Sequence, residues 1–136
     1  MILVDTPVWS LALRRRHGDL GARDRAHLQE WERLIRKGLA TLFGPIRQEL
    51  LSSVRDRPAW ERLRRALRPF PDLPAATEDF ERAAQYFNRC RERGVAGSAI
   101  DLLICAVAVR YGVAVYTTDT DFQRYARILN VELHGP

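Results

Sequence analysis

Apolar and polar positions along the chain alternate between two patterns. Short runs of branched apolar residues, typical of strands buried on both faces, occur at 2–4, 39–43 and 113–116. Between them, apolar residues recur with helical spacing, which predicts a series of amphipathic helices. The expected helices are 7–16, 23–37, one opening at 44–45 and carrying 46–51, then 55–68, 78–93, 99–110 and a short one ending at 128.

Two further segments complete the pattern. Residues 70–74 contain two prolines and predict a short extended connection or an edge strand, and residues 131–133 predict a last strand. Strands that alternate with helices predict an α/β fold, with a central parallel sheet flanked by helices. At 136 residues the chain has the length of a single domain, which we place at 1–136.

Acidic residues stand where the predicted strands end. Asp5 follows the first buried strand, and Asp119 and Asp121 follow the strand at 113–116. Asp101 opens the almost wholly apolar helix that leads into that strand, and Glu49 lies in the third helix. Ligands bind at the carboxyl ends of the strands in open α/β sheets, so we expect three or four of these carboxylates to converge there.

Each acid also has an ordinary structural explanation. Asp5 is a common N-cap residue, and Thr118–Asp121 and Ser98–Asp101 both resemble capping boxes. Glu49 taken alone is typical of a solvated helix face. The combination favours chemistry, because a buried carboxylate is costly unless it is paired, hydrogen-bonded or bound to metal.

A convergent set of carboxylates predicts a divalent cation. Two carboxylates about 4 Å apart repel by about 4 kcal/mol at an effective dielectric near 20. Hard oxygen ligands select Mg²⁺ or Mn²⁺, which also accept phosphate oxygens of a substrate. The expected chemistry is therefore hydrolysis of a phosphodiester by metal-activated water.

The charge balance agrees with a polyanionic substrate. The net charge is +5, and Lys37 is the only lysine among the 22 basic residues. Arginine binds phosphate through two parallel hydrogen bonds, although an arginine-rich genome would produce the same composition. The most basic helix, 55–68, carries the candidate polyanion-binding residues Arg62, Arg64 and Arg65.

Other classes of protein are disfavoured. The sequence contains no apolar run long enough to span a membrane and no visible signal peptide, so we expect a cytoplasmic protein. Cys90 and Cys105 have no metal-type spacing and suggest a reducing compartment, although one disulfide stays open. A phosphoryl-transfer domain of the receiver or dehalogenase-like kind would need a lysine at a strand end, whereas Lys37 ends a helix.

Four motifs in a fixed order resemble those of PIN-domain ribonucleases, and in particular the VapC-type toxins of bacterial toxin–antitoxin pairs. The motifs are ILVDTPVW at 2–9, QELL at 48–51, DLLICA at 101–106 and YTTDTDF at 116–122. The resemblance covers essentially the whole chain. It implies a PIN-like three-layer fold and endonucleolytic RNA cleavage that depends on Mg²⁺ or Mn²⁺.

The resemblance also assigns roles to single residues. It implies metal-binding and catalytic roles for Asp5, Glu49, Asp101 and Asp119, with Asp121 as a second acid that ranks below Asp119. Pro7 stands where many relatives carry serine. Residues beside the acids that could bind a metal water or orient a carboxylate are Thr6, Ser98 and Thr118.

Partners follow from the same resemblance. It implies a homodimer and a small VapB-like antitoxin whose tail packs near the active site. Apolar residues of the first two helices are candidates for that groove or, equally, for the core: Trp9, Leu13, Trp31 and Ile35. The alternative function is an inactive RNA-binding or regulatory domain, which the complete set of acids argues against.

Overall fold

The computed structural model describes residues 1–13 and 17–136, and within them five strands form one parallel sheet. The strand order is β3-β2-β1-β4-β5, so the first strand of the chain is central, as a doubly wound sheet requires. The strand bounds are β1 (Ile2–Val4), β2 (Ala40–Phe43), β3 (Asp72–Leu73), β4 (Ala114–Tyr116) and β5 (Leu133–His134).

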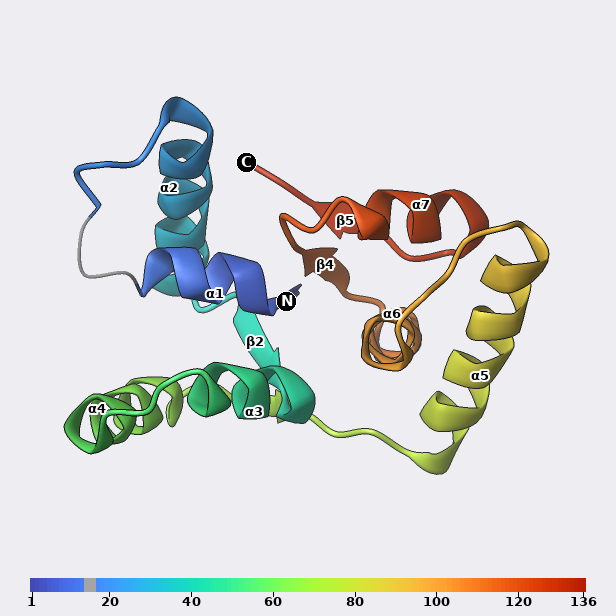
Figure 1. Cartoon of the computed structure of the whole chain (residues 1–136), viewed down its shortest axis with the longest axis horizontal. Coiled ribbons are helices and arrows are strands. Elements are labelled where there is room, and N and C mark those ends of the chain that lie inside the picture. The colour runs from blue at the N-terminus through green and yellow to red at the C-terminus, as the bar shows by residue number, and fades with distance from the viewer. Residues whose placement is uncertain (14–16) are drawn as a thin grey trace.

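Seven helices within the described residues cover the two faces of this sheet. Figure 1 shows α1 to α4 on one side of the strands and α5 to α7 on the other. This division follows from right-handed crossovers that run first toward β3 and then toward β5. The bounds are α1 (Thr6–Ala12), α2 (Ala22–Arg36), α3 (Gly44–Ser52), α4 (Arg57–Leu67), α5 (Thr77–Glu92), α6 (Ala99–Tyr111) and α7 (Asp121–Ile128).

The register of β1 aligns the residues that follow the two central strands. Leu3 and Val4 are fully buried, and Val4 is paired with Tyr116 of β4. The residues that follow these two strands, Asp5 and Thr117, therefore lie at the same carboxyl edge of the sheet. The amide of Asp5 donates to the carbonyl of Tyr116 at 2.9 Å, which extends the pairing to this edge.

The predicted α/β fold with a central parallel sheet is confirmed, with shifts at element ends. The first helix begins at Thr6 and ends at Ala12, and the arginines predicted to close it, 14–16, lie outside the described residues. The strand predicted at 131–133 is β5 at Leu133–His134, because the register with β4 begins at Leu133. The segment 70–74 does form an edge strand, β3, which pairs with β2.

The core lies between the sheet and its helices, and α6 is buried over most of its length. Residues 102–108 of α6 are all buried, as its apolar sequence predicts. Cys90 and Cys105 are both buried free thiols, so the disulfide left open by the sequence is absent from the described chain. None of the described helices is long and apolar enough to cross a membrane.

A single arginine joins the edge strand to the helices beside it. Arg47 of α3 donates from Nε to both carboxylate oxygens of Asp72 at 3.1 Å. It also donates to the carbonyls of Leu67, at the end of α4, and of Phe70, at 3.0 and 2.7 Å. Leu67 is the last residue of α4, so its carbonyl has no partner within the helix, whereas the carbonyl of Phe70 belongs to the connection that leads to β3.

We therefore expect Arg47→Met to lower the free energy of unfolding by about 2 kcal/mol, because hydrogen bonds to charged groups are lost together. Urea denaturation measures this, with Arg65→Met on the exposed side of α4 as the matched control. Equal stability of the two variants would show that the Arg47 bonds contribute nothing net.

Candidate functional site

Three of the predicted acids meet at the carboxyl edge of the sheet. Asp101, Asp119 and Asp121 each offer one carboxylate oxygen, and these oxygens lie within 4.8 Å of one another. Asp101 is at this edge because α6 begins there before the chain returns along β4. Asp119 lies in the loop after β4, and Asp121 is the first residue of α7. The hydroxyl of Tyr125 donates to Asp101 Oδ2 at 3.1 Å and so orients this carboxylate from α7.

Asp5 lies beside this group and is the most buried of the candidate acids. It is 6% exposed, and Thr117 Oγ1 donates to Asp5 Oδ2 at 2.8 Å. Burial raises the pKa of Asp5 to about 6, with the charges of Asp101 and Glu49 adding to the effect and hydrogen bonds from Thr117 and the Thr6 backbone opposing it. Asp5 does occupy the N-cap position of α1, but its side chain makes no capping hydrogen bond, so capping does not account for the carboxylate.

Glu49 reaches the site from α3. The hydroxyl of Thr6, the first residue of α1, donates to Glu49 Oε2 at 3.1 Å. The predicted position of Thr6 beside the acids is therefore correct, and this bond links α1 to α3 at the sheet edge. Glu49 is also near enough to Asp5 for its charge to act on the pKa of that carboxyl.

The capping explanations hold for one motif and fail for the other. Ser98 Oγ accepts from the amide of Asp101 at 3.0 Å, so Ser98 caps α6 and leaves the Asp101 carboxylate free to face the cluster. The N-cap of α7 is Thr120 and makes no side-chain capping bond, so the capping-box alternative for Thr118–Asp121 does not hold. Instead, Asp119 Oδ1 accepts from the amide of Asp121 at 2.9 Å.

Asp101 is less enclosed than the sequence predicts. It is half-buried and its neighbour Ile100 is 45% exposed, because the first turn of α6 projects beyond the sheet. Burial still raises its pKa, and the charges of Asp119 and Asp121 act in the same direction against hydrogen bonds from Tyr125 and Ser98. The site is thus both open to a ligand and short of positive charge.

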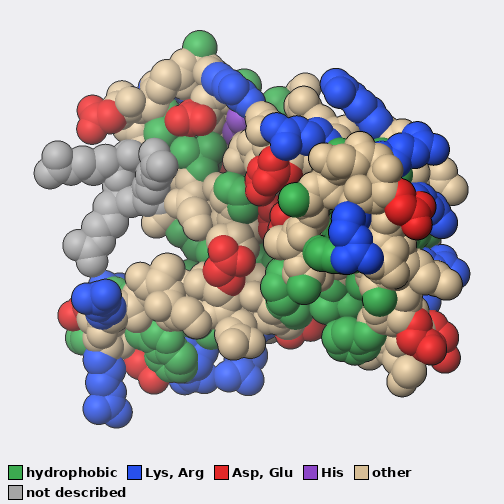
Figure 2. All heavy atoms as spheres, turned by 45° about the vertical axis from the view of Figure 1, so that its right-hand side comes forward, with side chains coloured by type: hydrophobic (Ala, Val, Ile, Leu, Met, Phe, Trp, Pro, Cys, Tyr) green, Lys and Arg blue, Asp and Glu red, His purple; other side chains and the backbone are tan. Residues whose placement is uncertain are grey.

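The donor set suits a hard divalent cation. Its ligand atoms are carboxylate oxygens, the class that Mg²⁺ and Mn²⁺ prefer, and no thiolate or imidazole belongs to the three-residue cluster. Figure 2 shows Asp and Glu side chains gathered near the middle of one face, with Lys and Arg side chains around them. Burial is the main cause of the raised pKa values of Asp5 and Asp101, and a cation there would stabilise the ionised form of both carboxyl groups.

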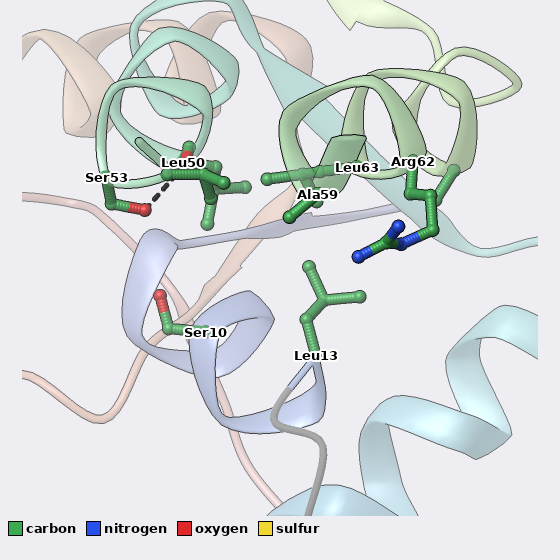
Figure 3. A pocket seen from close by; sticks show the side chains of 9 residues that line it. Ser10, Leu13, Leu50, Ser53, Ala59, Arg62 and Leu63 are labelled. Atoms are coloured by element: carbon green, nitrogen blue, oxygen red, sulfur yellow. Dashed lines mark hydrogen bonds between the residues drawn. The ribbon is translucent and has the colours of Figure 1, made fainter. Parts of the chain in front are cut away.

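The predicted groove on the first two helices is not formed as expected. Trp9 is 1% exposed and donates from Nε1 to the carbonyl of Val4, and Trp31 and Ile35 are partly buried against the core. Leu13, 38% exposed, instead lines an apolar pocket of about 470 Å³ between α1, α3 and α4. Figure 3 shows Leu13 pointing across this pocket toward Ala59 and Leu63 of α4.

The three candidate arginines of α4 differ in their surroundings. Arg62 lines the pocket of Figure 3, and Arg64 is paired with Glu61 at 2.9 Å. Arg65 is exposed. None of the three belongs to the acidic cluster, so the structure offers them to a long substrate or a partner rather than to the reacting group.

Sequence reasoning missed two residues that hold the site together. Thr117 binds Asp5, and its position follows from the strand register, which needs only the pairing of β1 with β4. Tyr125 binds Asp101 across 24 residues, and no pattern in the sequence marks it.

Comparisons with known proteins agree with this geometry. Residues 2–128 match the family model described as PIN domain. Ribonuclease VapC11 of Mycobacterium tuberculosis is 32% identical over 136 residues, 97% of this chain and 96% of that protein. The fold matches that of FitAB bound to an IR36 DNA fragment, with a TM-score of 0.75 and 21% identity over 98% of this chain and 94% of that one. It also matches VapBC2 of Rickettsia felis bound to promoter DNA, with a TM-score of 0.67 and 16% identity over 98% of both chains.

The raised pKa of Asp5 makes stability depend on pH. The folded state holds a proton on Asp5 up to about pH 6, whereas the unfolded chain loses it near 3.8. The folded state therefore binds more protons between these values, and its stability falls as pH rises through them. In EDTA, we compare the free energy of unfolding of Asp5→Asn with that of the wild type. We expect the difference to shift in favour of the variant by roughly 2 to 3 kcal/mol between about pH 4 and about pH 7.

Urea denaturation of both proteins at the two pH values measures this difference, in which the titration of other carboxyl groups largely cancels. A difference that does not change with pH would show that Asp5 ionises normally in the fold.

Proposed function

The chain belongs to the PIN-domain family and is a homologue of VapC ribonucleases, and on this premise we propose that it is a metal-dependent endoribonuclease acting as the toxin of a type II toxin–antitoxin pair. The observation that carries the proposal is the convergence of Asp101, Asp119 and Asp121 beside the buried Asp5. Four acids from distant parts of the chain meet where an α/β sheet binds its ligand.

We assign the metal to these carboxylates. Asp5, Asp101 and Asp119 would hold Mg²⁺ or Mn²⁺, with Asp121 and Glu49 completing the acidic wall. When bound, the ion supplies Lewis-acid charge for hydrolysis of a phosphodiester. The chain contributes orientation, because hydroxyl groups fix three of the carboxylates: Thr117 on Asp5, Thr6 on Glu49 and Tyr125 on Asp101.

The partner would be a small antitoxin that uses the pocket of Figure 3. This pocket is apolar, with Leu13, Leu50 and Leu63 in its wall, and Arg62 gives it one cation at the rim. Such a surface suits the apolar side chains of a helix or an extended tail that also carries a carboxylate. The homodimer and RNA binding by Arg62, Arg64 and Arg65 stay predictions.

Cleavage of total RNA by the purified protein tests the activity directly. We expect discrete fragments with Mg²⁺ or Mn²⁺ and none with EDTA. Asp101→Asn should lower the rate by at least about 100-fold, since even residues that only orient metal ligands cost 10–100-fold. Glu81→Gln, on the exposed side of α5, is the matched control and should cleave normally. RNA that is bound but left intact under every condition would favour the inactive RNA-binding domain instead.

Inhibition by the cognate antitoxin tests the pocket. Ala59→Glu places a charge in the apolar pocket at a helix start that tolerates an acid, so the fold should survive. We expect this variant to cleave RNA normally but to need at least about tenfold more antitoxin for inhibition, because the added carboxylate occupies the apolar pocket and competes for Arg62, three residues further along α4. The control is Ala75→Glu in the exposed loop before α5. Unchanged inhibition of Ala59→Glu would place the antitoxin elsewhere.

A further inference from the structure

A second, more polar cavity adjoins the acids on the side of α2. It has a volume of about 180 Å³ and shares Thr117, Thr118 and Asp119 with the site already described. The rest of its wall comes from α2, α7 and the end of β5, through Arg23, His27, Gln123, Leu133, His134 and Gly135. We call it the α2–β5 cavity. A ligand that reaches the acids along this side must pass over or enter it.

The inner face of α2 changes from apolar to cationic toward this cavity. Leu34 is fully buried in the core, and Glu30, one turn earlier, is 9% exposed and contacts His134 Nε2 at 2.7 Å. Hydrogen bonds from Arg33 and His134 hold the pKa of Glu30 at about 2, so Glu30 is ionised and fully engaged within the protein. The next turns present His27 and then Arg23, which are four residues apart and share this face.

His27 is held so that one ring nitrogen is left for a ligand. The hydroxyl of Tyr116 donates its single proton to the carbonyl oxygen of His27 at 3.2 Å. We assign the contact of 2.7 Å between His27 Nδ1 and the same hydroxyl oxygen as a hydrogen bond donated by Nδ1, the tautomer in which the hydroxyl keeps its bond to the carbonyl. Burial, followed by the charge of Arg23, lowers the pKa of His27 and keeps the ring neutral. Nε2 therefore carries a lone pair and accepts a hydrogen bond.

Arg23 supplies the cation at the mouth. It is exposed and makes no hydrogen bond or ion pair with the described residues, so its guanidinium is available to a ligand. A guanidinium binds phosphate through two parallel hydrogen bonds. The cavity thus combines Arg23, which can donate hydrogen bonds to a phosphate, with His27 Nε2, which can accept a hydrogen bond from a hydroxyl group.

We propose that the α2–β5 cavity binds one ribose–phosphate unit of the RNA, next to the phosphodiester held at the acids, with Arg23 on its phosphate and His27 Nε2 accepting from its 2′-hydroxyl. This assignment rests on the proposed nuclease function. The 2′-hydroxyl is the group that distinguishes RNA from DNA at a given site, so the cavity would select RNA. Hydrogen-bonding groups dominate its wall and Leu133 is its one aliphatic side chain, which favours backbone over a stacked base.

Binding without cleavage tests the proposal. Fluorescence anisotropy in EDTA would compare labelled oligo(U) with oligo(dU), which differ in the 2′-hydroxyl, and oligo(A) with oligo(C). We expect the wild type to prefer oligo(U) over oligo(dU) by about tenfold, the value of one such hydrogen bond. Arg23→Met should weaken binding of both by about tenfold, and His27→Phe should reduce the preference to about one.

Matched controls separate these effects from general losses. Arg36→Met removes a cation from the other end of α2, and His17→Phe replaces a histidine outside the cavity. Both should bind as the wild type does, and thermal melting confirms that every variant is folded at the assay temperature. Because His27 also contacts Tyr116, Arg23→Met provides a test that leaves the core unchanged.

Several results would overturn the proposal. These are equal binding of oligo(U) and oligo(dU) by the wild type, an RNA preference that survives in His27→Phe, or Arg23→Met binding like Arg36→Met. Losses confined to one of oligo(U), oligo(A) or oligo(C) would assign the cavity to a base instead. Failure of the nuclease itself is seen separately, as intact RNA in the Mg²⁺ assay.

Discussion

The parallel pairing of β1 with β4 is the constraint on which the site depends. β1 has three residues and is central in the sheet, so its position is fixed by neighbours on both sides and by the burial of Leu3 and Val4. Its register brings Asp5 and Thr117 to the same edge, and α6 and the loop after β4 bring the other acids to that point. A slip of one residue would turn the side chains of β1 to the opposite faces and separate Asp5 from Thr117.

The same edge concentrates negative charge that the fold neutralises only in part, through Arg124 at 3.8 Å from Asp121. The other enclosed acids are paired: Asp79 with Arg110, and Glu30 with Arg33 and His134. Asp5 and Asp101 have hydroxyl groups in place of cations, and their pKa values are raised where that of Asp79 is lowered. This contrast within one chain separates the acids that are paired within the fold from the acids to which we assign the metal.

The sequence predicted those features of the fold and of the site that depend on the periodicity of apolar residues and on the positions where strands end. The α/β class, the helices and the convergence of Asp5, Asp101 and Asp119 follow from apolar patterns and from where parallel strands end. The burial of Trp9 did not follow, because α1 is short and apolar on several sides, so its pattern does not show which side faces the core. The contact of His27 with Tyr116 joins residues 89 apart, and only the packed fold brings them together.

With the divalent cation that we propose at Asp5, the burial of this residue would also make the proton and the cation alternatives at one carboxyl group. With a pKa of about 6, Asp5 is partly protonated in mildly acidic solution, and an ion must displace that proton to bind there. Metal capture is then a proton-releasing exchange whose affinity weakens with acidification. Acidification and a rising free metal concentration would thus act in opposite directions on one carboxyl group at the end of the central strand.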